Sequence, residues 1–297
     1  MSMQSCLRSV ALWSVLAAGA LPLSSLAQDK FTDPAAAGQA LVKAIENSDS
    51  AALARVLGPQ WKRLLPPGGV APEDRAAFLA AWHDRNAVVR NGKTAHLEVG
   101  TPGWQLPIPL RETAQGWQFD PVAARDEIRT RRIGRNELRT VQSLLAVFDA
   151  QREYSSTARD GRTSPVYARR FISQPGRQDG LYWPTPDGAP ESPLGPLFAE
   201  DLPGDGYHGY RFRMLSAQGP HARGGARSYL LDGQLSRGFA VLAWPVKYGE
   251  TGVMSFMINH DGQVYERDLG PQTATRAPSI SRFDPDPGWK AVDAARP

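Results

Sequence analysis

The chain has 297 residues, a formal net charge of +4, 41% hydrophobic residues and one cysteine, Cys6. Its length allows one large domain or two medium ones, each with a hydrophobic core of its own. The small basic excess excludes the strongly cationic composition of a nucleic-acid-binding protein, so we expect no nucleic-acid partner.

Residues 1–27 have the pattern of a cleavable signal peptide. Arg8 supplies a positive start, an apolar run extends from Val10 to Leu21, and Ser25-Leu26-Ala27 is a small-residue cleavage site. The run is shorter than the ~20 residues that cross a bilayer, and no later stretch is long enough. We therefore expect a periplasmic protein that begins at Gln28 and has no membrane span.

The cysteine falls inside this signal peptide, so the mature protein is expected to be free of cysteine. This excludes disulfides, thiolate metal sites and a cysteine nucleophile from the mature chain.

Residues 28–130 are predicted to form an N-terminal α+β domain. Helix-capping patterns predict three helices, which begin near Asp33, Asp49 and Pro72. Two strands and a turn follow, and then a short helix that carries Ile128.

The first of these strands runs from Ala95 to Val99, where apolar and polar residues alternate as in a half-buried strand. The second runs from Leu106 to Leu110 and contains Pro107 and Pro109, which lack the N–H group that pairs strands. We therefore expect it at an edge of the sheet.

The stretch 131–154 is predicted to be the longest helix of the mature chain and to open the second domain, 131–297. Its apolar residues step by three, four and three along one helical stripe, which should be buried: Leu138, Val141, Leu145 and Phe148. Gly134 marks the expected break between this helix and the short one before it.

The rest of the chain, from residue 155, is predicted to contain an irregular packed layer and then an antiparallel sheet. The layer is rich in Gly, Pro and Asp and has one short helical piece, Tyr167 to Phe171. A strand from Tyr210 to Met214 alternates with Arg211 and Arg213, which predicts a solvated basic face. The runs 238–244 and 253–258 are nearly continuous apolar strands that should pair at the centre of the sheet.

The fold class is therefore α+β, with N-terminal helices and a small antiparallel sheet, a long central helix, and a C-terminal antiparallel sheet.

Four residues form the best candidate for a ligand-binding surface, provided that neighbouring hairpins bring them together: His208, Arg211, Tyr248 and His260. Both histidines stand in or beside turns, where side chains are often presented to a ligand. Mere packing between adjacent hairpins stays open as the alternative. A sugar platform among the loop tryptophans Trp104, Trp183 and Trp289 is a further alternative to packing in the core.

Recognisable catalytic motifs are missing from the sequence. It contains no Gly-x-Ser-x-Gly, His-Glu-x-x-His or Walker pattern, and the five histidines do not have the spacing of metal ligands. We therefore identify no catalytic residue and expect neither a metal nor a cofactor.

Six ordered blocks resemble one family of secreted bacterial proteins that is known only as a domain of unknown function. The blocks are RRIGRNEL (131–138), AQREY (150–154), DGLYWP (179–184), SPLGPL (192–197), YHGYRFRMLSAQGP (207–220) and YGETGVMSFMINHDGQVYERDLG (248–270). The family has no established activity, so the resemblance implies no chemistry.

The half from Leu138 onward is also similar to the globular head of type IV pilin-like proteins. The resemblance lies in a helix that ends in AQREY, an irregular layer, a GYRF strand and the strand pair TGVMSFMINHDGQVY. A pilin keeps an apolar N-terminal helix, whereas this chain is expected to lose its signal peptide and to carry an extra domain. The resemblance therefore implies the head fold alone.

These observations favour a secreted periplasmic protein that binds or scaffolds a component of the envelope without catalysing a reaction. The partner would be an envelope protein or cell-wall material. The alternative is a cell-wall-directed hydrolase or transferase that has no recognisable motif.

Overall fold

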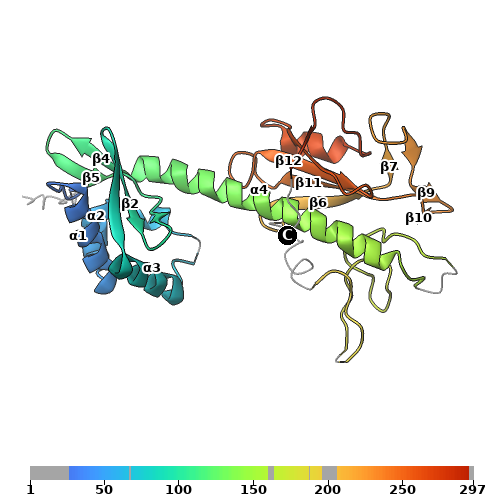
Figure 1. Ribbon diagram of the computed structural model, residues 1–297, viewed down its shortest axis with the longest axis horizontal. Coiled ribbons are helices and arrows are strands. Elements are labelled where there is room, and N and C mark those ends of the chain that lie inside the picture. The colour runs from blue at the N-terminus through green and yellow to red at the C-terminus, as the bar shows by residue number, and fades with distance from the viewer. Residues whose placement is uncertain (1–26, 67, 160–163, 187, 196–205, 294–297) are drawn as a thin grey trace, which may run out of the picture. The chain divides into compact units, whose positions relative to one another are not determined.

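The computed structural model describes residues 27–66, 68–159, 164–186, 188–195 and 206–293 (Figure 1). Its contacts divide the chain after Pro121 into two compact units. Both are α+β, as the sequence predicts. The sequence placed the start of the second domain at residue 131, which lies inside the long helix α4. Apart from Ala27, the expected signal peptide lies outside the described residues.

The first unit begins with helices whose bounds follow the predicted caps: α1 (Pro34–Glu46), α2 (Ser50–Leu57), the 3-10 helix η1 (Trp61–Leu64) and α3 (Pro72–Asp84). The carboxylate of Asp33 accepts a hydrogen bond from Ala36 N at 2.9 Å, and Asp49 caps α2 in the same way. These caps confirm the predicted starts of the first two helices.

The sheet of this unit has the order β1-β2-β4-β5, and β3 also pairs with β2. The strands are β1 (Asn86–Asn91), β2 (Thr94–Val99), β3 (Trp104–Gln105), β4 (Leu110–Thr113) and β5 (Gly116–Phe119). In β2, Ala95, Leu97 and Val99 are buried, as the alternation predicts.

The prediction of an edge strand from Leu106 to Leu110 is wrong. Pro107 and Pro109 lie in the link between β3 and β4, and the strand begins only at Leu110. β4 is an inner strand between β2 and β5. The prolines end the pairing of one short strand and precede the next, so the missing N–H groups never fall within a ladder.

The open side of β5 is covered by the segment that follows the expected cleavage site. Phe31 and Trp117 exchange two backbone hydrogen bonds of 2.8 Å. The side-chain amide of Gln28 donates to Val56 O at 3.0 Å and to Phe119 O at 2.8 Å. Residues 28–31 therefore belong to the folded unit.

The second unit is organised around α4 (Pro121–Tyr154), a single continuous helix. The predicted break at Gly134 is wrong, because that glycine lies on an exposed side of the helix with open space around it. One exposed glycine costs a helix only about 1 kcal/mol relative to alanine, which a helix of this length tolerates.

The buried stripe of α4 is displaced from the predicted one. Leu138 is 61% exposed and Leu145 is only partly buried, whereas Val141 and Phe148 are buried. The side chains that the helix buries along its second half include Thr140, Leu144, Val147, Gln151 and Tyr154, which step by four, three, four and three. The helical period was predicted correctly, but its phase was not.

The main sheet of the second unit is antiparallel throughout, in the order β14-β13-β12-β11-β6. Its strands are β6 (Tyr210–Leu215), β11 (Ala240–Pro245), β12 (Met254–Asn259), β13 (Val264–Asp268) and β14 (Lys290–Ala291). β11 pairs with β12 in the register Ala240 to Asn259, which confirms the predicted central pair. β12 and β13 form the predicted hairpin.

Two short strand pairs and a layer of irregular segments complete the second unit. The pairs are β7 (Ala217–Gln218) with β8 (Arg227–Ser228), and β9 (Leu230–Leu231) with β10 (Gln234–Leu235). The predicted helical piece from Tyr167 to Phe171 is wrong: Tyr167 forms an extended bridge with Leu235. The layer is packed as expected, because Phe171, Leu181 and Leu194 are buried.

The two faces of the main sheet have different covers (Figure 1). α4 lies on one face, where Gln151 Nε2 contacts Met214 Sδ at 3.7 Å. On the other face lie α6 (Thr273–Arg276), the 3-10 helix η2 (Ala277–Ser279) and the segment that leads to β14. No helix within the described ranges is long and apolar enough to cross a membrane.

The predicted solvated basic face of β6 is only half present. Arg211 is exposed, but the guanidinium of Arg213 donates to the backbone carbonyls of Ala277, Pro278 and Ile280. Burial lowers the pKa of Arg213. This arginine fastens η2 to the face of the sheet opposite α4 and is not part of a solvated surface.

Candidate functional site

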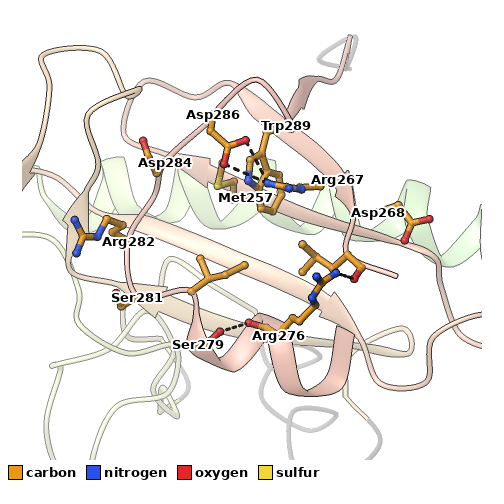
Figure 2. Close-up of a pocket in the computed structure, with 12 residues that line it drawn as sticks. Met257, Arg267, Asp268, Arg276, Ser279, Ser281, Arg282, Asp284, Asp286 and Trp289 are labelled. Carbon is orange, nitrogen blue, oxygen red and sulfur yellow. Dashed lines mark hydrogen bonds and ion pairs between the residues drawn. The ribbon is translucent and has the colours of Figure 1, made fainter. Parts of the chain in front are cut away.

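A cavity of about 450 Å³ lies over the sheet face that α4 leaves free (Figure 2). Its floor comes from the β12–β13 hairpin, and its walls come from α6, η2 and the segment that follows. The lining residues are Met257, Arg267, Asp268, Leu269, Arg276, Ser279, Ile280, Ser281, Arg282, Asp284, Asp286 and Trp289. Volumes of this size are typical of sites for small molecules.

The apolar part of the lining is fixed in place by the hydrophobic core. Met257, Leu269 and Trp289 are all less than a tenth exposed. Asp286 positions the tryptophan, because its carbonyl accepts from Trp289 N at 2.8 Å and its carboxylate accepts from Gly288 N at 2.7 Å. The floor is therefore preformed.

Arg267 lines the cavity and pairs with Asp286 (Figure 2). Its Nη1 lies 3.2 Å from both carboxylate oxygens. A Cβ atom on Gly288 would come within 2.8 Å of the guanidinium carbon, so the glycine makes room for this arginine. Both partners are more than a third exposed, and such pairs contribute only about 0.2–1 kcal/mol, so this ion pair sets geometry more than stability.

Two further arginines of the cavity have no carboxylate partner among the described residues. Arg276 donates from Nη1 to the backbone carbonyl of Leu269 at 2.8 Å, which fixes its direction. Arg282 makes no hydrogen bond to any other described residue. Both residues are exposed, so their charges are available to a ligand.

Two aspartates of the cavity are held by donors other than arginine or lysine. Asp268 accepts from Tyr248 OH at 3.1 Å and from Gly270 N at 2.7 Å. Asp284 Oδ1 accepts from His221 N at 2.8 Å and lies 3.1 Å from the Nδ1 atom of the same histidine. Gly219 has no Cβ atom, and one placed there would meet the Asp284 carboxylate at 2.3 Å.

The structure separates His260 from the other three residues that the sequence grouped as a candidate site. Tyr210 lies opposite Pro245, and Leu215 lies opposite Ala240, which in turn lies opposite Asn259. His208 and Arg211 therefore lie at the β6 start, whereas His260 lies at the other end of the sheet. The Tyr248 hydroxyl bonds Asp268, which pairs with Met254 at the same end as His208.

His260 belongs to a separate polar cluster. Its Nε2 lies 3.0 Å from Arg227 Nη2, and its ring stands edge-on to Tyr229 at 5.2 Å. Burial, together with the charge of Arg227, lowers the pKa of His260 against the opposing effects of Asp261 and the Phe239 backbone. The neutral ring can accept a hydrogen bond from Arg227 and packs closely on Gly238, where a Cβ would lie 2.6 Å from Nδ1.

Tyr248, a member of the predicted set, touches the cavity lining through Asp268. Lost hydration, followed by the hydrogen bond to Asp268 and the charge of that residue, raises the pKa of Tyr248. The sequence analysis pointed directly to Trp289 of the cavity lining, which it placed in a loop and considered as part of a sugar platform. Arg276, Arg282 and Asp284 carry no motif and were missed.

The described ranges contain no group of three or more His, Cys, Asp or Glu residues that could hold a metal ion.

Comparison with known proteins gives one match. The family model described as "Protein of unknown function (DUF2950)" matches residues 28–292. No curated protein and no solved structure matches the chain.

Proposed function

The chain belongs to this family of proteins of unknown function, and on that premise we propose that it is an exported envelope protein that binds a ligand through an anionic group. Arg276 and Arg282 carry this proposal, because they border a preformed cavity and lack a carboxylate partner among the described residues. An arginine fork suits a carboxylate or a phosphate, which it can bind with two parallel hydrogen bonds.

Export to the periplasm is supported by the start of the folded chain. The family match begins at residue 28, and the side chain of Gln28 is hydrogen-bonded into the first unit. The segment before it has the signal-peptide pattern. N-terminal sequencing of the periplasmic fraction should give Gln28, whereas retention of Met1 contradicts export by cleavage.

A pilin-like head fold for residues 138–297 is supported by the order of its elements. A helix covers one face of an antiparallel sheet, and an irregular layer separates the two in sequence. The test is an experimental structure of this half. Failure of the sheet to superpose on a pilin head in strand order would remove the analogy.

One pair of residues favours the alternative of a hydrolase or transferase. The imidazole of His221 lies 3.1 Å from Asp284, a geometry by which a carboxylate can orient a general base. Incubation with purified cell-wall material tests this alternative. Release of soluble fragments by the wild type, with loss of release in His221→Ala, would establish an enzyme.

The binding proposal is tested by calorimetry at low salt with two monoanions, the carboxylate N-acetyl-Ala-Leu and the phosphodiester dimethyl phosphate. The first is expected to bind if the natural group is a carboxylate, and the second if it is a phosphate. Arg276→Gln should weaken binding at least ~10-fold, the loss of one charge-assisted contact of about 1.4 kcal/mol or more.

Arg237→Gln is the matched control, because Arg237 is an exposed arginine of the same unit that does not line the cavity. If no ligand that carries the anionic group binds, or if the two arginine variants weaken binding equally, the proposal is wrong.

A further inference from the structure

We propose that the ligand of this cavity is a zwitterion of the amino-acid or short-peptide class, which carries an ammonium group as well as a carboxylate. This inference rests on the proposed function and deepens it. It follows from the negative charges of the cavity, which anion binding alone leaves unexplained.

The cavity lining has equal numbers of charges of both signs. Three arginines face three aspartates, and only the pair formed by Arg267 and Asp286 neutralises itself. The four remaining charges are two guanidinium groups and two carboxylates. A purely anionic ligand would bring a third negative group close to the two free carboxylates and would be opposed by them.

These four charges form two sets at different ends of the cavity (Figure 2). Arg282 and Asp284 are two residues apart in the chain at one end. Arg276 lies toward the other end, where its guanidinium bonds Leu269 O, next to Asp268. Each end therefore offers one free cation and one carboxylate that no arginine or lysine pairs with in the described part of the chain.

The two carboxylates are oriented but not neutralised. Tyr248 OH and Gly270 N hold Asp268, and both are uncharged donors. Asp284 uses only Oδ1 for His221, and its Oδ2 has no hydrogen-bond partner within the described residues. An ammonium group brings three N–H donors and a positive charge, which match the vacant acceptor.

The apolar surface between the two ends suits the body of such a ligand. Met257, Leu269 and Trp289 present a preformed apolar floor between the charged ends. A volume of about 450 Å³ holds an amino acid or a short peptide. A ligand with charged termini and an apolar side chain would use both features.

The experiment compares one dipeptide in three forms by calorimetry on the mature protein. Ala-Leu carries both charges, N-acetyl-Ala-Leu carries only the carboxylate, and Ala-Leu amide carries only the ammonium. We expect Ala-Leu to bind at least 10-fold more tightly than either blocked form. Asp284→Asn should remove most of the advantage of Ala-Leu over N-acetyl-Ala-Leu and leave the acetylated form unaffected or slightly tighter.

Asp149→Asn is the matched control, because Asp149 is an exposed aspartate on α4, which covers the opposite face of the sheet. Thermal melts of each variant show that it is folded before binding is measured. Asp268→Asn provides a second carboxylate variant with the same expectation.

The outcomes separate the two proposals. Equal binding of Ala-Leu and N-acetyl-Ala-Leu keeps the anion site and overturns the zwitterion inference. An unchanged preference for Ala-Leu in both aspartate variants also overturns the inference. Failure of all three forms to bind, together with failure of dimethyl phosphate, overturns both proposals.

Discussion

A single carboxylate oxygen of Glu137, on α4, lies 2.8 Å from the backbone nitrogen of Val253. The same oxygen accepts from Met254 N at 2.9 Å. One helical residue thus satisfies two N–H groups at the start of β12. Neighbouring contacts join α4 to the turn that precedes β12, because Asn136 donates to Thr251 O at 2.8 Å and Arg132 pairs with Glu250 at 3.0 Å.

Replacement of Glu137 should therefore loosen the attachment of α4 to the sheet. Glu137→Ala leaves two partly buried N–H groups without an acceptor, and we expect it to lower the free energy of unfolding by roughly 2–4 kcal/mol. Glu137→Gln keeps an acceptor oxygen of the same shape and should cost less than half as much. Urea unfolding followed by circular dichroism measures both variants, and equal losses would contradict this role of the oxygen.

The displaced helical stripe gives a paired test on α4. Leu144 is fully buried and Leu138 is 61% exposed. Leu144→Ala should cost about 2–5 kcal/mol, the usual range for a large-to-small change in a core. Leu138→Ala should stay within about 0.5 kcal/mol of the wild type. A larger loss in Leu138→Ala than in Leu144→Ala would show that the stripe lies where the sequence alone placed it.

The His260 cluster predicts a loss of stability on mild acidification. Its folded-state pKa lies below the ordinary value of 6.5, so in this pH range the unfolded chain binds more protons than the folded one. The contribution is fully present above pH 6.5 and is lost as the pH falls through 6.5 toward the lower folded value. Protonation also ends the ability of Nε2 to accept from Arg227.

Urea unfolding at a series of pH values from about 7.5 to 5 measures this slope. His260→Gln removes the titrating group, so the variant should show a shallower dependence on pH than the wild type. Parallel slopes for the two proteins would exclude His260 as the cause.

On the proposed cleavage before Gln28, the anchored side chain of Gln28 predicts that the new N-terminus resists cyclisation. A free N-terminal glutamine can cyclise when its α-amino group attacks the side-chain carboxamide and ammonia leaves. Here the Nε2 atom of that carboxamide donates to both Val56 O and Phe119 O. We expect the folded mature protein to keep an open Gln28 on prolonged incubation, and the urea-unfolded protein to lose ammonia faster. Intact-mass measurement follows the loss, and equal rates would contradict protection by the fold.

Local sequence signals predicted the caps, hairpins and central strands because each depends on neighbouring residues. Asp33, Asp49 and the Asn259–Gly262 turn act within a few positions of themselves. Two errors arose where tertiary context outweighed a local signal. Gly134 was tolerated inside a long helix, and the pair Pro107 and Pro109 fell between strands.

The candidate site was harder to predict, because it depends on the register of strands and on contacts between distant segments. The register of the paired strands places His208 and His260 at opposite ends of the sheet, although each lies beside a turn. Arg213 alternates with apolar residues as a solvated arginine would, yet three carbonyls from residues 277–280 surround it. The sequence alone contains no sign that this distant segment covers β6.

The segment from α6 to β14 is synthesised after β6, β11, β12 and β13, although it packs on the face of the sheet opposite α4. Until it emerges, side chains such as Leu242 and Met257, which end fully buried, remain exposed to water on that face. The second unit of a growing chain therefore exposes this apolar face until its last segment has been made. A premature stop just beyond β13 would leave this apolar face of the sheet uncovered. We expect such a truncated protein to aggregate or to be degraded.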